Sequence, residues 1–223
     1  MCTLETRLTR VIAPFVSWSW VRAQPEVVLA DARWYLDGRS GHEAYLAGHL
    51  PGAVFVDLDS WVAGPPSDEA GRNPLPDHSV FAEGMAQLGI GDDDIVVAYD
   101  DAGGVIAARL VWMLRVTGHR AAVLDGGLAA ADIGLETAPV QRPRAAFTAA
   151  NWPAERVADL EDVVSRQPSV TVVDARDPAR FAGQADPVDP TPGHIRAPST
   201  SLAGATSTAT GVCSRSTASR PPS

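Results

Sequence analysis

Cysteine is almost absent from this sequence of 223 residues, and its scarcity excludes several kinds of chemistry. Only Cys2 and Cys213 occur, one near each end. Two isolated thiols build neither a disulfide framework nor a thiolate metal cluster, and they suit a reducing compartment. The five histidines show no H-x-x-H or H-E-x-x-H spacing. We therefore expect no zinc site, no other metal and no cofactor.

Positive charge and long apolar runs are also scarce. The chain has 18 basic and 27 acidic residues and a net charge of −9. Nucleic acids and anionic membranes bind basic patches, so neither is expected as a partner. No apolar run approaches the ~18 residues that suggest a membrane-spanning helix. The N-terminus carries Glu5 and Pro14 and lacks a small-residue cleavage site, unlike a signal peptide. We expect a cytoplasmic protein.

What the sequence does contain is an internal repeat. One copy begins at Val27 and reads VVLADARWYLDGRSGHEAYLAGHLPGA, and the other begins at Val170 and reads VTVVDARDPARFAGQADPVDPTPGHI. Each copy runs from an apolar stretch into Asp-Ala-Arg and then reaches Gly-His followed by Leu or Ile. The offset between the copies is 143 residues at the Asp-Ala-Arg motifs and 145 at the Gly-His pairs. We therefore predict two copies of one domain.

The first copy reads as a complete α/β domain over residues 16–140. Apolar strands alternate in it with helical stretches, which predicts a parallel sheet with helices on both faces. The expected strands are 27–31, 54–56, 95–99 and 121–124, and the expected helices are 41–47, 79–88 and 105–117. The loops that follow the strands of such a sheet meet at one edge, where functional sites usually lie.

The second copy stops early. Residues 141–154 form a linker, and residues 155–195 hold only the first strand of the second copy and the turn that leads to the next. Residues 196–223 contain no Asp or Glu, are dominated by Ser, Thr and Ala, and show no convincing strand. This composition is typical of a disordered tail. An altered reading frame also explains it, and we favour that reading because GHLPGA in the first copy is answered only by GHIRAP.

The stretch VVAYDDAGGVIAARLVWMLRVTGH, residues 96–119, combines a strand, a glycine-rich turn and a helix. The free N–H groups of such a turn and the dipole of the helix make a cradle for an anion. The turn nevertheless opens with Asp100 and Asp101. A carboxylate here can accept the N–H groups itself, worth about 0.3–1 kcal/mol at a helix N-terminus. We predict that Asp100 fills the cradle as a permanent internal anion.

The motifs D-A-R-W-Y-L, G-H-L-P-G-A, V-V-A-Y-D and L-D-G-G-L together resemble the tandem-domain rhodanese family of thiosulfate and 3-mercaptopyruvate sulfurtransferases. The resemblance covers about residues 16–195. It implies a rhodanese-like fold and the transfer of sulfane sulfur from thiosulfate to an acceptor such as cyanide through a cysteine persulfide. In the family that cysteine opens the loop of the second domain, and its counterpart here would fall near residue 245. Asp100 occupies the equivalent place in the first domain, the copy that the resemblance marks as non-catalytic.

The resemblance also assigns a role to Arg180. In DPARFAG it matches the family arginine that binds the anionic end of the sulfur donor, and a guanidinium suits such a group geometrically. The structural alternative is an ion pair with Asp174 or Asp186. Family members that prefer mercaptopyruvate carry a further arginine near the place of Asp189, so the resemblance favours thiosulfate as the donor.

The other polar motif residues have structural explanations that we prefer. The Asp–Arg pairs at 31 and 33 and at 174 and 176 are expected to fasten loops, and the two motif histidines to cap their turns. Arg109 is expected to bond nearby backbone or Asp100. Neither cysteine has a loop, a helix start or a basic partner around it, so neither is expected to be a nucleophile. Three tryptophans are expected in the core or an interface: Trp34, Trp61 and Trp112.

Three functions remain open. The first is a rhodanese-type sulfurtransferase by ancestry, with a small anionic sulfur donor as partner, that is inactive as written because the catalytic cysteine loop is missing. The second is a non-catalytic binding or regulatory module with the rhodanese fold. The third is phosphoryl transfer with Asp100 or Asp101 as nucleophile, which lacks an accompanying lysine or second acidic motif. The sequence leaves the oligomeric state open.

Overall fold

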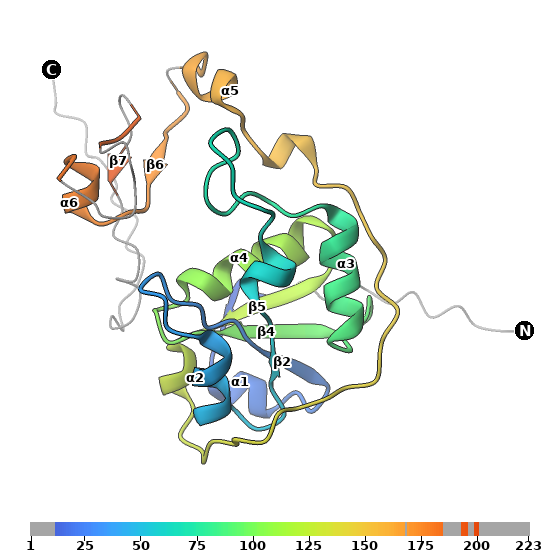
Figure 1. Cartoon of the computed structure of the whole chain (residues 1–223). Helices are drawn as coiled ribbons and strands as arrows, with labels where there is room; N and C mark the ends of the chain where they lie inside the picture. Colours follow the sequence, from blue (N-terminus) through green and yellow to red (C-terminus); the bar gives the residue numbers. More distant parts are fainter. Residues whose placement is uncertain (1–11, 168, 185–192, 196–198, 201–223) are drawn as a thin grey trace, which may run out of the picture.

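The computed structural model describes residues 12–167, 169–184, 193–195 and 199–200. Its main body is a five-stranded sheet in the order β1-β5-β4-β2-β3, in which every neighbouring pair is parallel (Figure 1). The strands are β1 (Phe15–Val16), β2 (Val27–Asp31), β3 (Val54–Phe55), β4 (Ile95–Tyr99) and β5 (Arg120–Leu124). The four strands predicted from the sequence are confirmed, and the short strand β1 adds a fifth.

The helices also lie where the apolar spacing predicts them. Helices α2 (Gly41–Ala47), α3 (His78–Gln87) and α4 (Val105–Val116) match the predicted segments within one residue at each end. Two begin at side-chain caps, because Ser40 accepts from the backbone N–H of Glu43 and Asp77 from that of Ser79. The sheet also carries α1 (Trp18–Arg22), the π-helical turn η1 (Leu58–Val62) and the 3₁₀ turn η2 (Gly127–Ala130).

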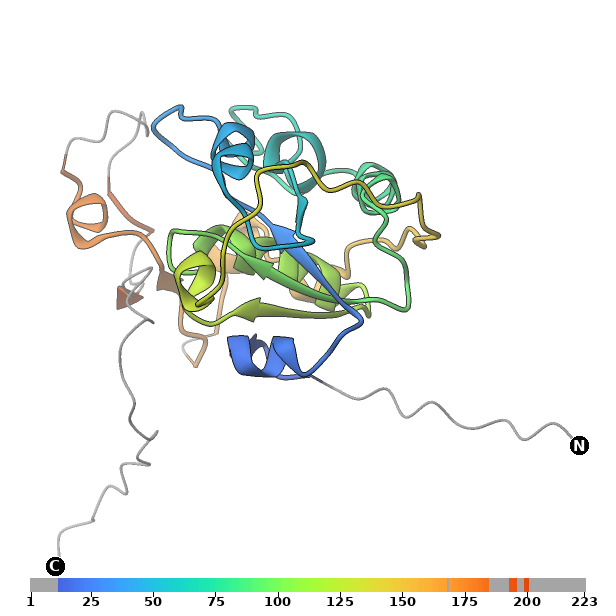
Figure 2. The ribbon, with the colours of Figure 1, turned by 90° about the horizontal axis from the view of Figure 1, so that it is seen from below.

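Alternating side chains of the strands feed two hydrophobic clusters, one on each face of the sheet. In β4, Val96 and Ala98 join the cluster under α3, α4 and η1. Val97 and Tyr99 point to the opposite face and join the cluster that includes Val21 of α1. Figure 2 shows α1 on one side of the sheet and α3 on the other. The predicted α/β class, a parallel rhodanese-like sheet with helices on both faces, is confirmed.

The segment predicted as a linker, residues 141–154, runs along the outside of the sheet domain and is bonded to it (Figure 1). Arg144 donates two hydrogen bonds to Glu83 of α3, at 2.7 and 2.6 Å. The indole N–H of Trp152 donates to the carbonyl of Pro76 at 2.7 Å. Phe147 packs edge-on against Phe81, which is buried in the core. The linker is therefore a strap that belongs to the first unit.

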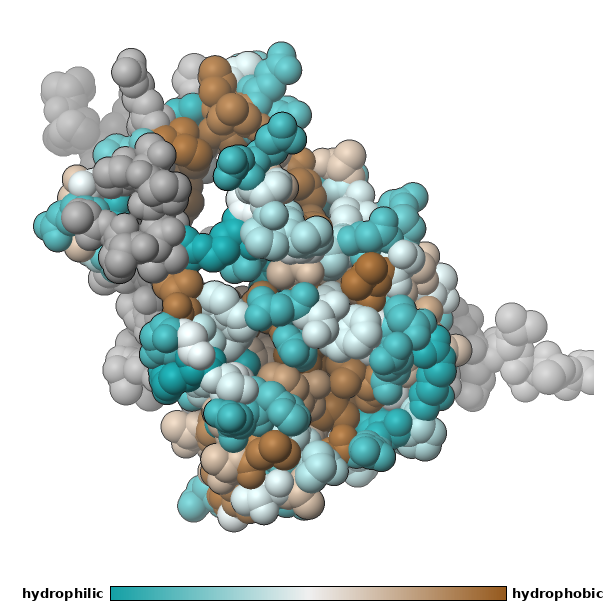
Figure 3. Space-filling model, in the orientation of Figure 1, coloured by the Kyte–Doolittle hydropathy of each residue, from teal (hydrophilic) through white to brown (hydrophobic). Residues whose placement is uncertain are grey.

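Beyond the strap the chain forms η3 (Ala154–Arg156), α5 (Leu160–Val164), β6 (Val173–Asp174), α6 (Pro178–Phe181) and β7 (Ser199–Thr200). Helix α5 begins with a capping box between Asp159 and Asp162. Leu160 and Val164 on this helix are 74% and 71% exposed, and Figure 3 shows hydrophobic residues on the surface over α5.

Strand β7 corrects one expectation from the sequence. It lies in the segment for which the composition predicts no strand, and the remainder of residues 196–223 lies outside the described residues. Strand β7 pairs in parallel with β6, Val173 opposite Ser199 and Asp174 opposite Thr200. The first copy pairs Ala30 with Val54 and Asp31 with Phe55 in the same way. Parallel pairing uses backbone groups, so a polar Ser-Thr segment can take the place of an apolar strand.

We expect the strap to loosen in acid. The side chains of Arg144 and Gln87 bond the carboxylate of Glu83 and lower its pKa from 4.5 to about 2. This stabilisation is present above pH ~4.5, where the unfolded carboxyl also ionises, and is lost as the pH falls through about 2. The indole N–H resonance of Trp152 should therefore shift and its hydrogen exchange accelerate between pH 4.5 and 2.

The variant Glu83→Gln should show the loosened strap already at neutral pH and should lose this acid transition. Glu69→Gln, which neutralises another exposed carboxylate, is the matched control and should behave like the parent. An acid transition of Trp152 that is the same in Glu83→Gln would show that this ion pair does not hold the strap.

Candidate functional site

The candidate site is the loop between β4 and α4. Strand β4 ends at Tyr99, and α4 begins at Val105 after a left-handed Gly104. Gly103 and Gly104 have φ angles of 76° and 88°, a region that side chains other than glycine rarely adopt. The turn directs backbone N–H groups of the loop and of the first turn of α4 toward one point. The loop thus has the shape of an anion cradle, as its glycines predict.

The carboxylate of Asp100 occupies that cradle. Its Oδ1 accepts hydrogen bonds from the backbone N–H groups of Ala102 at 2.9 Å and Gly104 at 2.7 Å. Its Oδ2 accepts from those of Ile106 at 2.8 Å and Ala107 at 2.9 Å. The residue is completely buried. The carboxylate of Asp100 therefore lies where the sequence predicts it, inside the cradle, and both of its oxygens accept hydrogen bonds from the loop.

A second glycine-rich turn, η2, packs directly against Asp100. The backbone N–H of Leu128 donates to the carbonyl of Asp100 at 2.9 Å. A Cβ atom on Gly127 would lie 2.3 Å from that same carbonyl oxygen, far inside van der Waals contact. Only glycine at position 127 allows η2 to approach the loop so closely. The L-D-G-G-L motif therefore fixes the Asp100 loop from outside while the four N–H bonds fix it from within.

Asp101 has a different environment from Asp100. It is exposed and accepts a hydrogen bond from the phenol of Tyr35 at 2.6 Å. Burial, the bond to Asp101 and the charge of Asp101 raise the pKa of Tyr35. The guanidinium of Arg39 lies 4.0 Å from the centre of the Tyr35 ring and pairs with Asp37. Sequence reasoning missed this contact, because nothing local connects two residues that are 66 positions apart.

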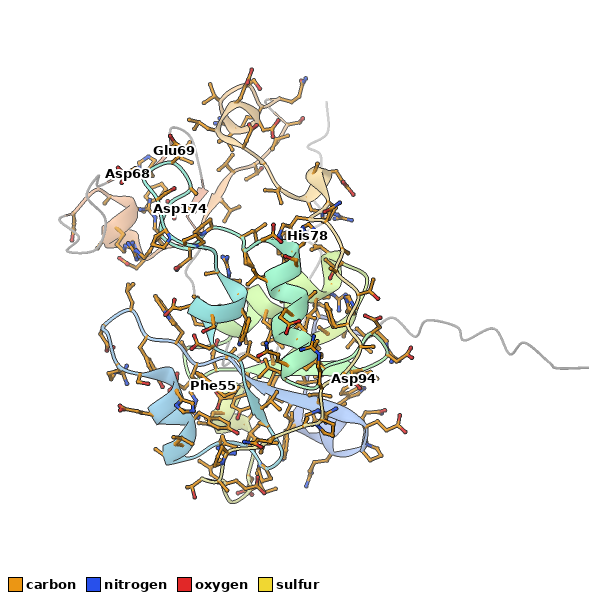
Figure 4. The ribbon with its side chains drawn as sticks, turned by 45° about the vertical axis from the view of Figure 1, so that its right-hand side comes forward. Phe55, Asp68, Glu69, His78, Asp94 and Asp174 are labelled. Atoms are coloured by element: carbon orange, nitrogen blue, oxygen red, sulfur yellow. The ribbon has the colours of Figure 1, made fainter. Side chains whose placement is uncertain are left out.

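The two Asp-Ala-Arg motifs form the same brace. Arg33 donates to both carboxylate oxygens of Asp31 and, through Nη2, to the carbonyl of Gly48 at 2.8 Å. Arg176 repeats every one of these bonds with Asp174 and reaches the carbonyl of Gly193 at 2.6 Å. The hydrogen bonds from Arg176 lower the pKa of Asp174, which lies on β6 (Figure 4), to about 2. The predicted loop-fastening role of both pairs is confirmed.

Each of the two motif histidines contacts a backbone carbonyl of the preceding helix instead of capping the turn in which it occurs. Nδ1 of His49 lies 2.8 Å from the carbonyl of Tyr45, and the two rings stack with centres 3.8 Å apart. Nδ1 of His194 lies 2.7 Å from the carbonyl of Phe181, and these rings stack at 4.0 Å. Each imidazole thus closes the last turn of the preceding helix, so the predicted target, the turn itself, was wrong.

Arg109 and the tryptophans have structural positions. Arg109 donates to the carbonyls of Val62 at 2.8 Å and Pro74 at 2.7 Å, and burial lowers the pKa of its guanidinium. Of the two expected partners, backbone is therefore correct and Asp100 is not. The three tryptophans that the sequence assigns to the core or an interface, Trp34, Trp61 and Trp112, pack against the larger cluster.

Arg180, the predicted donor-binding residue, lies on α6 and is partly buried. Its backbone N–H bonds the capping carboxylate of Asp177 at 3.1 Å. Asp174, one of the two acids considered as its ion-pair partner, is held by Arg176. Asp186 and Asp189 lie outside the described residues. The donor-binding role of Arg180 stays a prediction.

Two further observations concern metal binding and membrane spanning in the described part of the chain. Its His, Cys, Asp and Glu side chains form no group of three or more that could bind a metal ion. None of its helices has both the length and the apolar character needed to cross a membrane.

The protein is of the α/β class, with a parallel sheet and an anion-cradle loop that a carboxylate already fills. Comparison with known proteins identifies its family. Residues 19–131 match the rhodanese-like domain family. SseB of Mycobacterium tuberculosis, a relative named for thiosulfate sulfurtransferase activity, is 37% identical over 182 residues, which cover 78% of this chain and 64% of SseB. The 3-mercaptopyruvate sulfurtransferase of Escherichia coli is 36% identical over 193 residues, 80% of this chain and 66% of that enzyme.

The fold agrees with the sequence comparison. The crystal structure of SseA from Escherichia coli, a 3-mercaptopyruvate sulfurtransferase, superposes with a TM-score of 0.73 at 32% identity, over 86% of this chain and 75% of that one. The chain belongs to the rhodanese family. It spans about two thirds of the length of these two curated relatives.

Removing the carboxylate of Asp100 should be costly. Asp100→Ala leaves four N–H groups without their acceptor, two of them on the buried residues Gly104 and Ala107. We expect a loss of about 2–4 kcal/mol in the free energy of unfolding, measured by urea denaturation. The adjacent Asp101→Ala is the control and should cost about 1 kcal/mol or less, because it removes one exposed hydrogen bond. Equal losses in the two variants would contradict the internal-anion role.

Proposed function

We propose that the chain is a thiosulfate-type member of the rhodanese sulfurtransferases whose first unit serves as a non-catalytic copy. We further propose that a polypeptide of this sequence does not itself transfer sulfane sulfur. The observation that carries this proposal is the occupied cradle at Asp100. Family chemistry needs a cysteine thiolate whose charge the loop N–H groups stabilise, and which holds the sulfur as a persulfide. A carboxylate cannot form that intermediate.

The same geometry weighs against phosphoryl transfer. A carboxylate nucleophile must present an oxygen lone pair to the phosphorus atom. Both oxygens of Asp100 instead accept two N–H bonds each, and the residue is completely buried. Asp101 is exposed but bonded to Tyr35, and the described residues hold no cluster of acids for a magnesium ion. The described loop is therefore a structural element.

Arg180 is the residue that we propose to contact a small anionic sulfur donor. Its support is the match to the family motif and its place on α6 directly after the capped Asp177. Thiosulfate is the donor that the sequence favours, and cyanide or another thiophile would be the acceptor. We propose a cytoplasmic location, because two isolated cysteines suit a reducing compartment.

Thiosulfate should bind weakly. A single partly exposed arginine–anion contact is worth about 1 kcal/mol or less in water. Isothermal calorimetry should therefore find a dissociation constant no tighter than about 1 mM. Arg180→Ala should weaken this binding, and Arg166→Ala is a matched control on another arginine of the same part of the chain. Micromolar binding would contradict the expected weak affinity, and binding that Arg180→Ala leaves unchanged would contradict the proposed contact.

The purified polypeptide should show no thiosulfate-to-cyanide sulfur transfer above background. Cys213→Ser should leave that background unchanged, because the residues around Cys213 carry none of the glycine spacing of a cradle. Asp100→Cys should not create activity either, because it supplies a thiol without the donor-binding arginine opposite it. Turnover that disappears in Cys213→Ser would show that residues after 195 provide a working site.

A further inference from the structure

A hollow of about 500 Å³ lies beside the Asp100 loop, on the side of β1 and η2. Its apolar wall includes Phe15 of β1, Leu128 of η2, and Ile133 and Leu135 of the segment that follows η2. Phe15, Ile133 and Leu135 are 49%, 45% and 48% exposed, among the most exposed large hydrophobic residues of the sheet domain. Contiguous exposed apolar side chains of this kind mark an interaction site more often than scattered ones do.

The charge of the hollow has one sign. Within the part of the chain that the structure describes, its ionisable lining residues are Asp100, Asp101 and Asp125. Asp100 is sealed inside its cradle, so Asp101 and Asp125 are the exposed charges, and Asp132 is exposed between two lining residues of the wall. Among the described residues, no arginine or histidine lines the hollow. Its surface is therefore apolar with a negative rim.

A second hollow in the same domain has the opposite character. It lies around the loop after β2 and near Phe55 of β3 (Figure 4), and Arg33, Arg39 and Arg72 line it together with Asp57 and Asp59. A small anion would meet arginines as well as carboxylates there, but carboxylates alone among the charged lining residues beside η2. The hollow at β1 and η2 therefore selects against anionic ligands.

The hollow is also fixed in shape before anything binds. Its floor is the Asp100 loop, held by the four N–H bonds to the carboxylate, and η2 is seated on that loop through Gly127. The segment after η2 is anchored by two backbone bonds between His49 and Glu136, at 2.9 and 2.8 Å. A preformed surface loses little conformational freedom on binding.

We propose that this hollow is a docking site for a partner polypeptide that presents an apolar side chain next to an arginine or lysine. The apolar side chain would cover Phe15, Ile133 and Leu135, and the basic residue would pair with Asp125 or Asp101. A second copy of this chain fits poorly, because its net charge of −9 opposes approach to a negative rim. Anionic membranes and nucleic acids are repelled for the same reason.

Two matched peptides test the proposal on the full 223-residue chain. One is acetyl-Ala-Leu-Arg-Phe-Arg-Ala-amide, and the other carries Glu in place of each Arg. Nuclear magnetic resonance titration with the Arg peptide should shift the amide signals of Leu128, Ile133 and Leu135. The Glu peptide should bind at least tenfold more weakly, and raising the salt concentration should weaken only the Arg peptide.

Variants separate this hollow from the rest of the surface. Ile133→Ser and Asp125→Asn should each weaken the Arg peptide at least fivefold. Leu36→Ser is the apolar control, since Leu36 is 47% exposed and lines the other hollow, and Asp68→Asn is the charge control. Neither control should change binding.

Equal binding of the two peptides, or an equal loss in Leu36→Ser, would overturn the proposal. So would binding of free phenethylammonium as tight as that of the Arg peptide, because it would assign the site to a small molecule. None of these outcomes depends on sulfur transfer, so the result is separate from the proposed function.

Discussion

The carboxylate of Asp100 is the group on which the functional edge of this domain depends. Its four hydrogen bonds reach the loop at residues 102 and 104 and the first turn of α4 at residues 106 and 107. One side chain thus joins the end of β4 to the start of α4, and its backbone carbonyl also holds η2. The loop has the shape of an anion cradle, and the carboxylate of Asp100 fills it.

Much of this arrangement follows from local sequence. Strand β4 is an uninterrupted apolar run, and β2 is apolar up to its last residue, Asp31, which is what burial on both faces of a parallel sheet requires. The helix ends are marked by Ser40, Asp77 and Gly118, whose roles depend on a few neighbouring residues. The position of Asp100 in the cradle was also predictable, because the N–H groups that donate hydrogen bonds to it lie within seven positions of it.

Other features depend on contacts that no local pattern encodes. Strands β1 and β7 have two residues each, and they exist because a neighbouring strand offers backbone partners. The strap is fixed by Arg144 and Glu83, 61 positions apart. Its sequence reads as an ordinary linker because the strap is stabilised by the surface beneath it. The hollow at β1 and η2 likewise combines residues from three separate parts of the chain, so its negative charge is formed only when the chain is folded.

The brace formed by Arg33, and again by Arg176, closes a ring of backbone. The ring from the arginine to its glycine carbonyl spans 15 positions in the first copy and 17 in the second. The stacked aromatic lies four positions before the histidine in one ring and 13 in the other. Loop-closure entropy changes by only about 0.1 kcal/mol between rings of these lengths. A change of two residues in the length of the ring therefore costs little, and the interior of the ring is where a foreign segment could be grafted.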